Sequence, residues 1–174
     1  MFKINGTLLL GLQGEGEVKL PRKHVIFPPL PSMELEWNVR RYKRHFPEQL
    51  KQLLEYSNGF NLFAWHLMIR DIAIVRYSIS IYGFQTLEMR NRAGTTMLIP
   101  YDIPTEDLKR PKGCPETLLR VGSSEIINNT MKIIFVDTET GEAIMSDSDI
   151  YFVTDSWSSL DECLNTLYNE YSNR

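Results

Sequence analysis

The residues that could catalyse a reaction are few, because the 174 residues hold three histidines and two cysteines. His66 lies in the aromatic stretch Phe63 to Leu67, where packing at a surface or interface explains it. Cys163 falls in an apolar helical stripe, and no charge pattern beside Cys114 marks an activated thiol. Nucleophilic catalysis needs a base and an orienting group beside the nucleophile. We therefore expect no enzymatic activity, with a small enzyme built on His66 or Cys114 as the weaker alternative.

Metal and cofactor motifs give no positive signal. The segment from Asp137 to Glu142, DTETGE, has spaced carboxylates like a calcium loop, but the closing glutamate is missing at the required offset. The sequence has no CxxC or HxxxH pair, and Gly11, Gly14 and Gly16 are not followed by a Gly-Lys-Ser/Thr phosphate loop. We expect no metal, no cofactor and a turn at DTETGE.

The charge balance does not predict a nucleic-acid or membrane protein. The net charge is -3, and no stretch has the roughly 20 apolar residues of a membrane span. A basic run offers the best phosphate contacts: Arg40, Arg41, Lys43 and Arg44, with Arg70 and Arg76 as further candidates. Its one aromatic residue, Tyr42, falls on the apolar side of the expected helix, so a solvated face is the preferred interpretation and nucleic-acid binding the alternative.

The residues best suited to bind a partner protein are acidic or aromatic. The candidates are Trp37, Asp137, Glu139, Glu142, Asp147, Asp149 and Trp157. Trp37 lies off the apolar stripe of its helix, and Trp157 lies outside the stripe of the last helix. Aromatic anchors dominate interface energetics, and an acidic patch accelerates association with a basic partner. Reversing the charges of Glu139 and Glu142 is therefore expected to slow association without unfolding the domain.

The first half of the chain predicts a short extension followed by two helices. Residues 1–31 are interpreted as an extension, with a hairpin of Thr7 to Leu12 and Glu17 to Phe27 before a proline-rich connector. Ser32 caps a helix whose apolar stripe is Leu35, Val39, Tyr42 and Phe46. Pro47 opens a second helix, and Asn58-Gly59 supplies the left-handed residue that ends it.

The second half predicts strands and a closing helix. The segment 60–69 is apolar and aromatic, and expected strands cover 72–82 with one solvent-facing side, 95–99, 118–121, 131–136, 142–145 and 150–153, with a loop over 102–115. The apolar spacing of Leu160, Cys163, Leu164 and Leu167 predicts the helix. The order gives an α+β domain over 32–174: two helices, an antiparallel sheet of about five or six strands, and a terminal helix. The short apolar run Leu8 to Leu10 is no signal peptide, so we expect a cytoplasmic protein.

Five segments in order resemble the SUKH superfamily, named after the yeast Smi and Knr cell-wall regulators. They are FPEQLKQLLEYSNG, ISIYGF, TLLRVGSSE, IIFVDTETGEAIMSD and DSWSSLDECLNTLYNEY, which together span roughly residues 33–171. The first has a proline, an apolar helix and Asn-Gly, and the second is a strand ending in Ile-x-Gly. Residues 1–31 have no counterpart in the family pattern, and Trp157 stands where the family more often has Phe.

The resemblance implies a binding protein. Bacterial members of the superfamily are largely immunity proteins that neutralise polymorphic toxins by direct contact, and eukaryotic members are scaffolds or regulators. From it we expect a non-enzymatic domain whose partner is a toxin domain, with a regulatory scaffold as the alternative.

Overall fold

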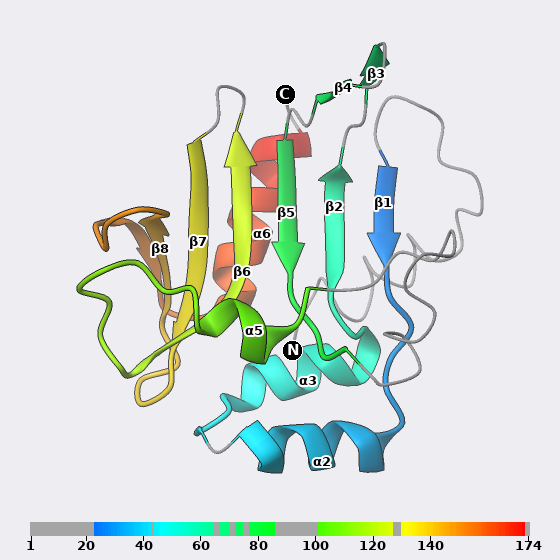
Figure 1. Cartoon of the computed structure of the whole chain (residues 1–174), viewed down its shortest axis with the longest axis vertical. Helices are drawn as coiled ribbons and strands as arrows, with labels where there is room; N and C mark the ends of the chain where they lie inside the picture. Colours follow the sequence, from blue (N-terminus) through cyan, green and yellow to red (C-terminus); the bar gives the residue numbers. More distant parts are fainter. Residues whose placement is uncertain are drawn as a thin grey trace.

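A computed structural model describes residues 23–42, 44–64, 67–69, 72–74, 77–85, 101–126 and 130–172. Its centre is a seven-stranded antiparallel sheet in the order β1-β2-β5-β6-β7-β8-β9 (Figure 1). The strands are β1 (Lys23–Ile26), β2 (Phe60–Ala64), β5 (Tyr77–Ile81), β6 (Leu118–Ile126), β7 (Thr130–Asp137), β8 (Ala143–Asp147) and β9 (Val153–Trp157). A separate hairpin of β3 (Leu67–Ile69) and β4 (Ile72–Ile74) lies between β2 and β5 in the chain.

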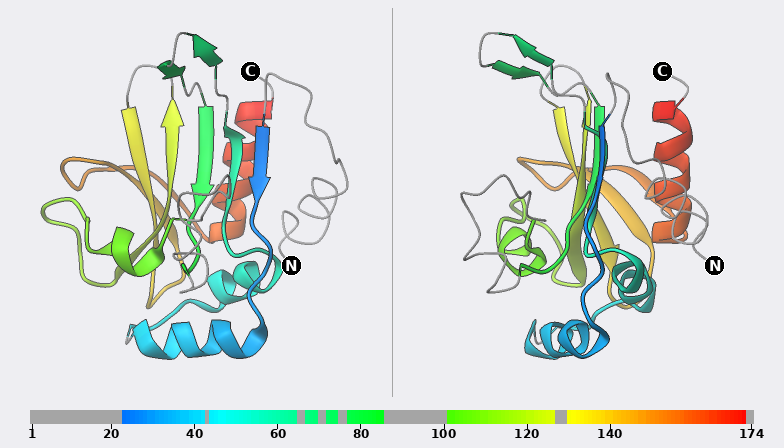
Figure 2. Two further views of the ribbon diagram at one scale, coloured as in Figure 1. Left: turned by 45° about the vertical axis from the view of Figure 1, so that its right-hand side comes forward. Right: turned by 90° about the vertical axis from the view of Figure 1, so that its right-hand side faces the viewer.

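Four helices of the described residues surround the sheet. They are α2 (Ser32–Tyr42), α3 (Glu48–Tyr56), α5 (Ile103–Asp107) and α6 (Leu160–Ser172). The helices α2 and α3 lie across one end of the sheet, α6 covers one face, and α5 lies on the opposite face (Figure 2). The predicted α+β class, with two early helices and a closing helix, is confirmed.

The sheet is wider than predicted because part of the expected extension joins it. The edge strand β1 pairs with β2, so Val25 lies opposite Asn61. Beyond it, the N–H of Phe27 donates to the carbonyl of Gly59 at 3.1 Å. The other expected arm, Thr7 to Leu12, and the expected strand over 95–99 lie outside the described residues.

The two early helices form much as their spacing predicts. In α3 the buried stripe is Leu50, Leu53 and Leu54. Phe46 is buried as expected, but it follows the end of α2 instead of continuing its stripe. Gly59 has the predicted positive φ, at 87°. However, α3 already ends at Tyr56, and the next residue, Ser57, has an extended backbone. The left-handed residue therefore starts β2 and does not terminate the helix.

The last helix begins at a capping arrangement that serine and glutamate supply. The Ser159 hydroxyl accepts the N–H of Glu162 at 3.1 Å, and the Glu162 carboxylate accepts the N–H of Ser158 at 3.0 Å. These bonds satisfy donors that a helix N-terminus otherwise leaves unpaired. The predicted stripe of Leu160, Cys163, Leu164 and Leu167 is buried, and Tyr171 extends it.

Three expectations about local structure are wrong, and one is the strand expected over 150–153, because β9 begins only at Val153. The loop predicted over 102–115 contains the helix α5, whose Pro104 lies in the first turn, where a proline is tolerated. The serine side of β5 is not wet, because Ser78 and Ser80 are each only 4% exposed. Alternation is typical of a half-exposed strand, but this sheet is covered on both faces (Figure 2).

Candidate functional site

Two of the quoted segments meet at the end of the sheet beside α3. The side-chain amide of Asn58 donates to the Phe84 carbonyl at 2.8 Å, and the Phe84 N–H donates back to Asn58 Oδ1 at 2.7 Å. At Gly83 an added Cβ would lie 2.2 Å from the Asn58 carbonyl oxygen. The Asn-Gly and Ile-x-Gly motifs therefore lock two backbones together, and their buried atoms are not available to a partner.

Gln49 joins two more of these segments to α3. Its Oε1 accepts the Leu160 N–H at the start of α6, at 2.9 Å. A Cβ added to Gly141 in the turn after β7 would lie 3.6 Å from Gln49 Nε2, which is ordinary contact. The segments thus converge on the structural junction of α3, α6 and the β7–β8 turn.

A buried charged network anchors α5, the helix that sequence reasoning missed. Asp107 accepts the Tyr42 hydroxyl at 2.5 Å and the Arg120 N–H at 2.9 Å, and it pairs with Arg44. Glu106 pairs with Arg120 at 3.3 Å. Burial raises the pKa of Tyr42, and its bond to Asp107 adds to that rise. In this network the Tyr42 hydroxyl is a hydrogen-bond donor that ties α2 to α5.

Arg44 belongs to this network and not to an exposed basic surface. Besides Asp107, it donates to the carbonyl oxygen of Leu118 at 3.2 Å. Arg40 pairs with Glu36, and Arg41 lies 5.0 Å above the Trp37 ring. In the basic run, Arg44 is therefore a structural cation, and Arg40 and Arg41 lie on the surface of α2. Lys43, Arg70 and Arg76 lie outside the described residues.

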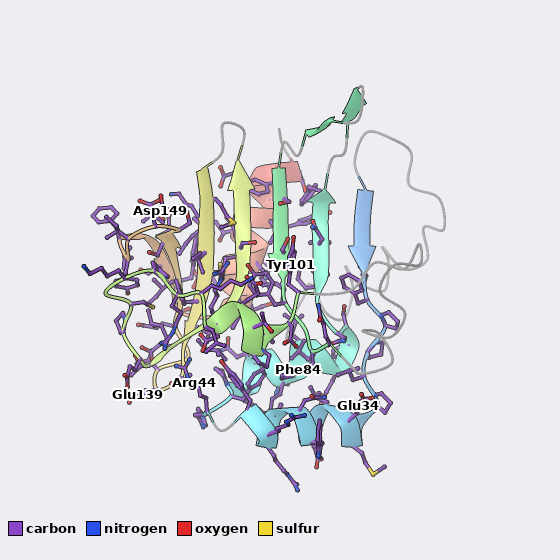
Figure 3. All side chains as sticks on the ribbon, viewed as in Figure 1. Glu34, Arg44, Phe84, Tyr101, Glu139 and Asp149 are labelled. Atoms are coloured by element: carbon purple, nitrogen blue, oxygen red, sulfur yellow. The ribbon has the colours of Figure 1, made fainter. Side chains whose placement is uncertain are left out.

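A cavity of about 700 Å³ lies between α2 and α5. Its lining is Glu34, Trp37, Asn38, Arg41, Tyr42, Phe84, Gln85, Asp102, Pro104, Thr105 and Leu108. Phe84 and Glu34 are labelled at this end of the molecule in Figure 3. Trp37 is exposed at the rim of this cavity, as its position off the apolar stripe of the helix predicted. The cavity size falls within the range of ligand and docking sites.

The predicted acidic residues lie at two separate places along β8. Asp137, Glu139 and Glu142 are in or beside the β7–β8 turn, and Asp147 and Asp149 follow the other end of β8. Glu139 and Asp149 are well apart in Figure 3.

Asp137 has a structural task in its turn. Its carboxylate accepts the N–H groups of Glu139 at 2.8 Å and Thr140 at 3.0 Å, and the Thr117 hydroxyl at 3.1 Å. Partial burial alone would raise the pKa of Asp137, but these donors together hold it below its ordinary value. Glu139 and Glu142 are the exposed carboxylates of this turn.

The hairpin between β8 and β9 exposes apolar side chains that sequence reasoning did not single out. Ile150 and Phe152 are 68% and 65% exposed, and Val153 is exposed beside them. The loop is held in place, since the Phe152 N–H donates to Ser146 Oγ at 2.9 Å and the Tyr151 N–H to the Lys112 carbonyl at 3.3 Å. In the sequence these residues form an apolar run beside Asp147 and Asp149. That run predicts an edge strand, so its exposure was not predicted.

Trp157 does not stand out as an exposed anchor. It is half-buried on β9 opposite Ala143 and packs against the main core. Phe152 is the exposed aromatic residue of this part of the chain.

The cysteines are in packing environments. Cys163 is fully buried in α6, and Cys114 packs against a small second core of Leu118, Ile133 and Phe135. Burial raises the pKa of the Cys114 thiol, and the charge of the neighbouring Arg110 opposes that rise only in part. His66 lies outside the described residues.

Among the described residues, no group of histidine, cysteine and carboxylate side chains is arranged to hold a metal ion. No helix in the same part of the chain has the length and apolar character needed to cross a membrane. Comparisons with protein-family models, curated proteins and solved structures found no match to this chain.

Proposed function

We propose that this chain is a non-enzymatic, cytoplasmic protein-binding domain that uses the β8–β9 hairpin as its main contact surface. In keeping with its resemblance to the SUKH superfamily, its partner is a toxin domain that it neutralises by direct contact. One observation carries the proposal: the exposed apolar residues Ile150, Phe152 and Val153 lie within four consecutive positions of the chain. Contiguous exposed apolar groups are typical of interaction sites, whereas single ones are common on any surface.

The charges around the hairpin favour a basic partner. Asp147 and Asp149 are exposed beside the apolar residues, and Asp155 follows on β9. Lys132 approaches Asp155 at 4.0 Å, which leaves the two loop carboxylates as the negative charges next to Phe152. A rim of this sign accelerates association with a cationic protein surface, while the apolar residues slow dissociation.

Edge geometry supports the same surface. Among the described strands β9 ends the sheet, and β8 is its strand neighbour. A short edge strand beside an apolar loop offers both backbone and side-chain contacts to a partner.

The chemistry of the described residues supports a binding role over the enzyme alternative. Cys114 is half-buried against the second core, where burial raises the pKa of its thiol, and the buried carboxylates of α5 are engaged by Arg44, Arg120 and Tyr42. A regulatory scaffold of the same superfamily remains the second candidate, and it requires the same hairpin with a partner that is not a toxin.

Affinity co-purification from the native cells, followed by mass spectrometry after a high-salt wash, tests the proposal. We expect the wild type to retain one stoichiometric protein with a toxin-like terminal domain. The double variant Ile150→Ser/Phe152→Ser should lose at least about 90% of it, because truncating interface anchors typically costs more than tenfold in affinity. Tyr56→Ser is the matched control, since it removes an exposed aromatic residue from α3.

Equal recovery by the hairpin variant and the wild type would refute the hairpin as the contact surface. A hairpin-dependent partner with no toxin-like domain would favour the regulatory scaffold.

A further inference from the structure

We propose that this chain associates with a second copy of itself through the exposed face of α2, with the two helices antiparallel about a twofold axis near Trp37. The surface is distinct from the β8–β9 hairpin, because α2 lies on the side of α3 that faces away from the sheet, and Glu34 and Asp149 are far apart in Figure 3.

The exposed face of α2 is apolar at its centre and on one side. Met33 is 84% exposed and Trp37 is 56% exposed, and a spacing of four residues puts them on one helix face. Leu108, at the end of α5 across the cavity, is 87% exposed. A helix that shows large apolar groups to water on its outer side is a candidate for helix-to-helix contact.

The charges of α2 are divided between its two halves. Glu34 and Glu36 lie before Trp37, and Arg40 and Arg41 lie after it. An antiparallel pair therefore sets the acidic half of each helix against the basic half of the other, whereas a parallel pair would set like charges together. This self-complementarity is what a twofold interface requires, because the same surface must fit itself.

The existing contacts of these charges are weak enough to be exchanged. Arg40 and Glu36 form a pair at 3.2 Å within the helix, but both side chains are largely exposed. Exposed pairs of this kind contribute little to stability, so an intermolecular partner can replace an intramolecular one. Arg41 stacks on Trp37 and keeps its guanidinium at the centre of the face.

The size of the surface predicts weak association. The 11 residues of α2 span about 16 Å, so one helix pair buries less than the roughly 800 Å² per partner of a stable interface. Dimers should therefore form reversibly and only at high protein concentration.

Sedimentation equilibrium from about 10 µM to about 1 mM tests the proposal with the chain alone. The acid-reversed variant is Glu34→Lys/Glu36→Lys, and the base-reversed variant is Arg40→Glu/Arg41→Glu. We expect each to weaken self-association at least tenfold, and an equimolar mixture of the two to form a heterodimer as tight as the wild-type dimer. Trp37→Ala should also weaken the dimer at least tenfold, and circular dichroism checks that each variant folds.

Glu139→Lys/Glu142→Lys is the matched control, since it makes the same charge change as the acid-reversed variant on another surface. It should associate like the wild type. A wild type that stays monomeric over the whole range would overturn the proposal, as would reversed variants that dimerise normally or a mixture without heterodimer. Because no partner protein is present, these outcomes do not depend on the function proposed for the hairpin.

Discussion

At the scale of single residues, the junction of Asn58 with Gly83 and Phe84 fixes how the helices meet the sheet. Both Asn58 bonds to the Phe84 backbone are buried, so each replaces hydration that folding removes. Gly83 is required because its backbone lies against that of Asn58 without room for a side chain. The same residues that resemble a family motif are therefore explained by packing.

Gly83→Ala is expected to destabilise the domain by more than about 3 kcal/mol, because its methyl group would collide with the backbone carbonyl of Asn58. Gly113→Ala is the matched control: it has a positive φ of 85°, but no atom lies within 4 Å of the added Cβ. It should cost only about 1 kcal/mol, from backbone strain. Urea unfolding of the two variants measures the difference, and equal losses would contradict the role of close packing.

At the scale of elements, ion pairs hold the helix α5 against the rest of the fold, because the helix is too short to be stable alone. Five residues are too few for a helix to persist alone in water. Asp107 and Glu106 tie it to Arg44 beyond α2 and to Arg120 on β6. One wall of the cavity beside Trp37 therefore depends on a buried network that also includes Tyr42.

Asp107→Ala should destabilise the protein by about 3–5 kcal/mol, since it leaves buried or half-buried cationic groups without their carboxylate. It also removes the acceptor of the Arg120 N–H, so hydrogen exchange at that amide should accelerate. Tyr42→Phe removes one hydroxyl but keeps the Arg44 pair, and it should cost only about 1 kcal/mol. Equal losses in urea unfolding would show that Asp107 acts mainly through the tyrosine.

At the scale of the whole molecule, the predicted acidic residues form two groups, and only one of them lies beside exposed apolar side chains. The turn carboxylates Glu139 and Glu142 lie at one end of β8, and the hairpin with Asp147, Asp149 and Phe152 lies at the other. Carboxylates at either place can attract a basic partner over a long distance. At physiological salt, charges more than roughly 8 Å from the contact are largely screened, so those next to the contact have the stronger effect. The hairpin carboxylates should therefore matter more to a basic partner.

The charge reversal Asp147→Lys/Asp149→Lys should lower the association rate with the co-purified partner by about tenfold at low salt. Glu139→Lys/Glu142→Lys makes the same charge change at the turn and should have a smaller effect. Stopped-flow association at two ionic strengths measures both, with dissociation rates nearly unchanged. A larger effect at the turn would place the contact surface there, as the sequence alone predicted.

Regular elements were predictable from local patterns, and the surfaces were predictable only in part. Apolar spacing found α3 and α6, and the position of Trp37 off its stripe found its exposure. The helix α5 was missed because it is short and its contacts include residues far away in sequence, such as the bond from Tyr42 to Asp107. The exposure of Phe152 and the partial burial of Trp157 were missed because both depend on which strand ends the sheet.

The bond from the Leu160 N–H to Gln49 spans 111 positions of the chain. While the protein is being synthesised, the neighbouring strands β6, β7 and β8 can pair through short turns as they emerge, since local contacts close quickly. The cap supplied by Gln49 has to wait until α6 has left the ribosome. Until then the nascent chain keeps α3 and the sheet face that α6 covers exposed, which favours aggregation and chaperone binding.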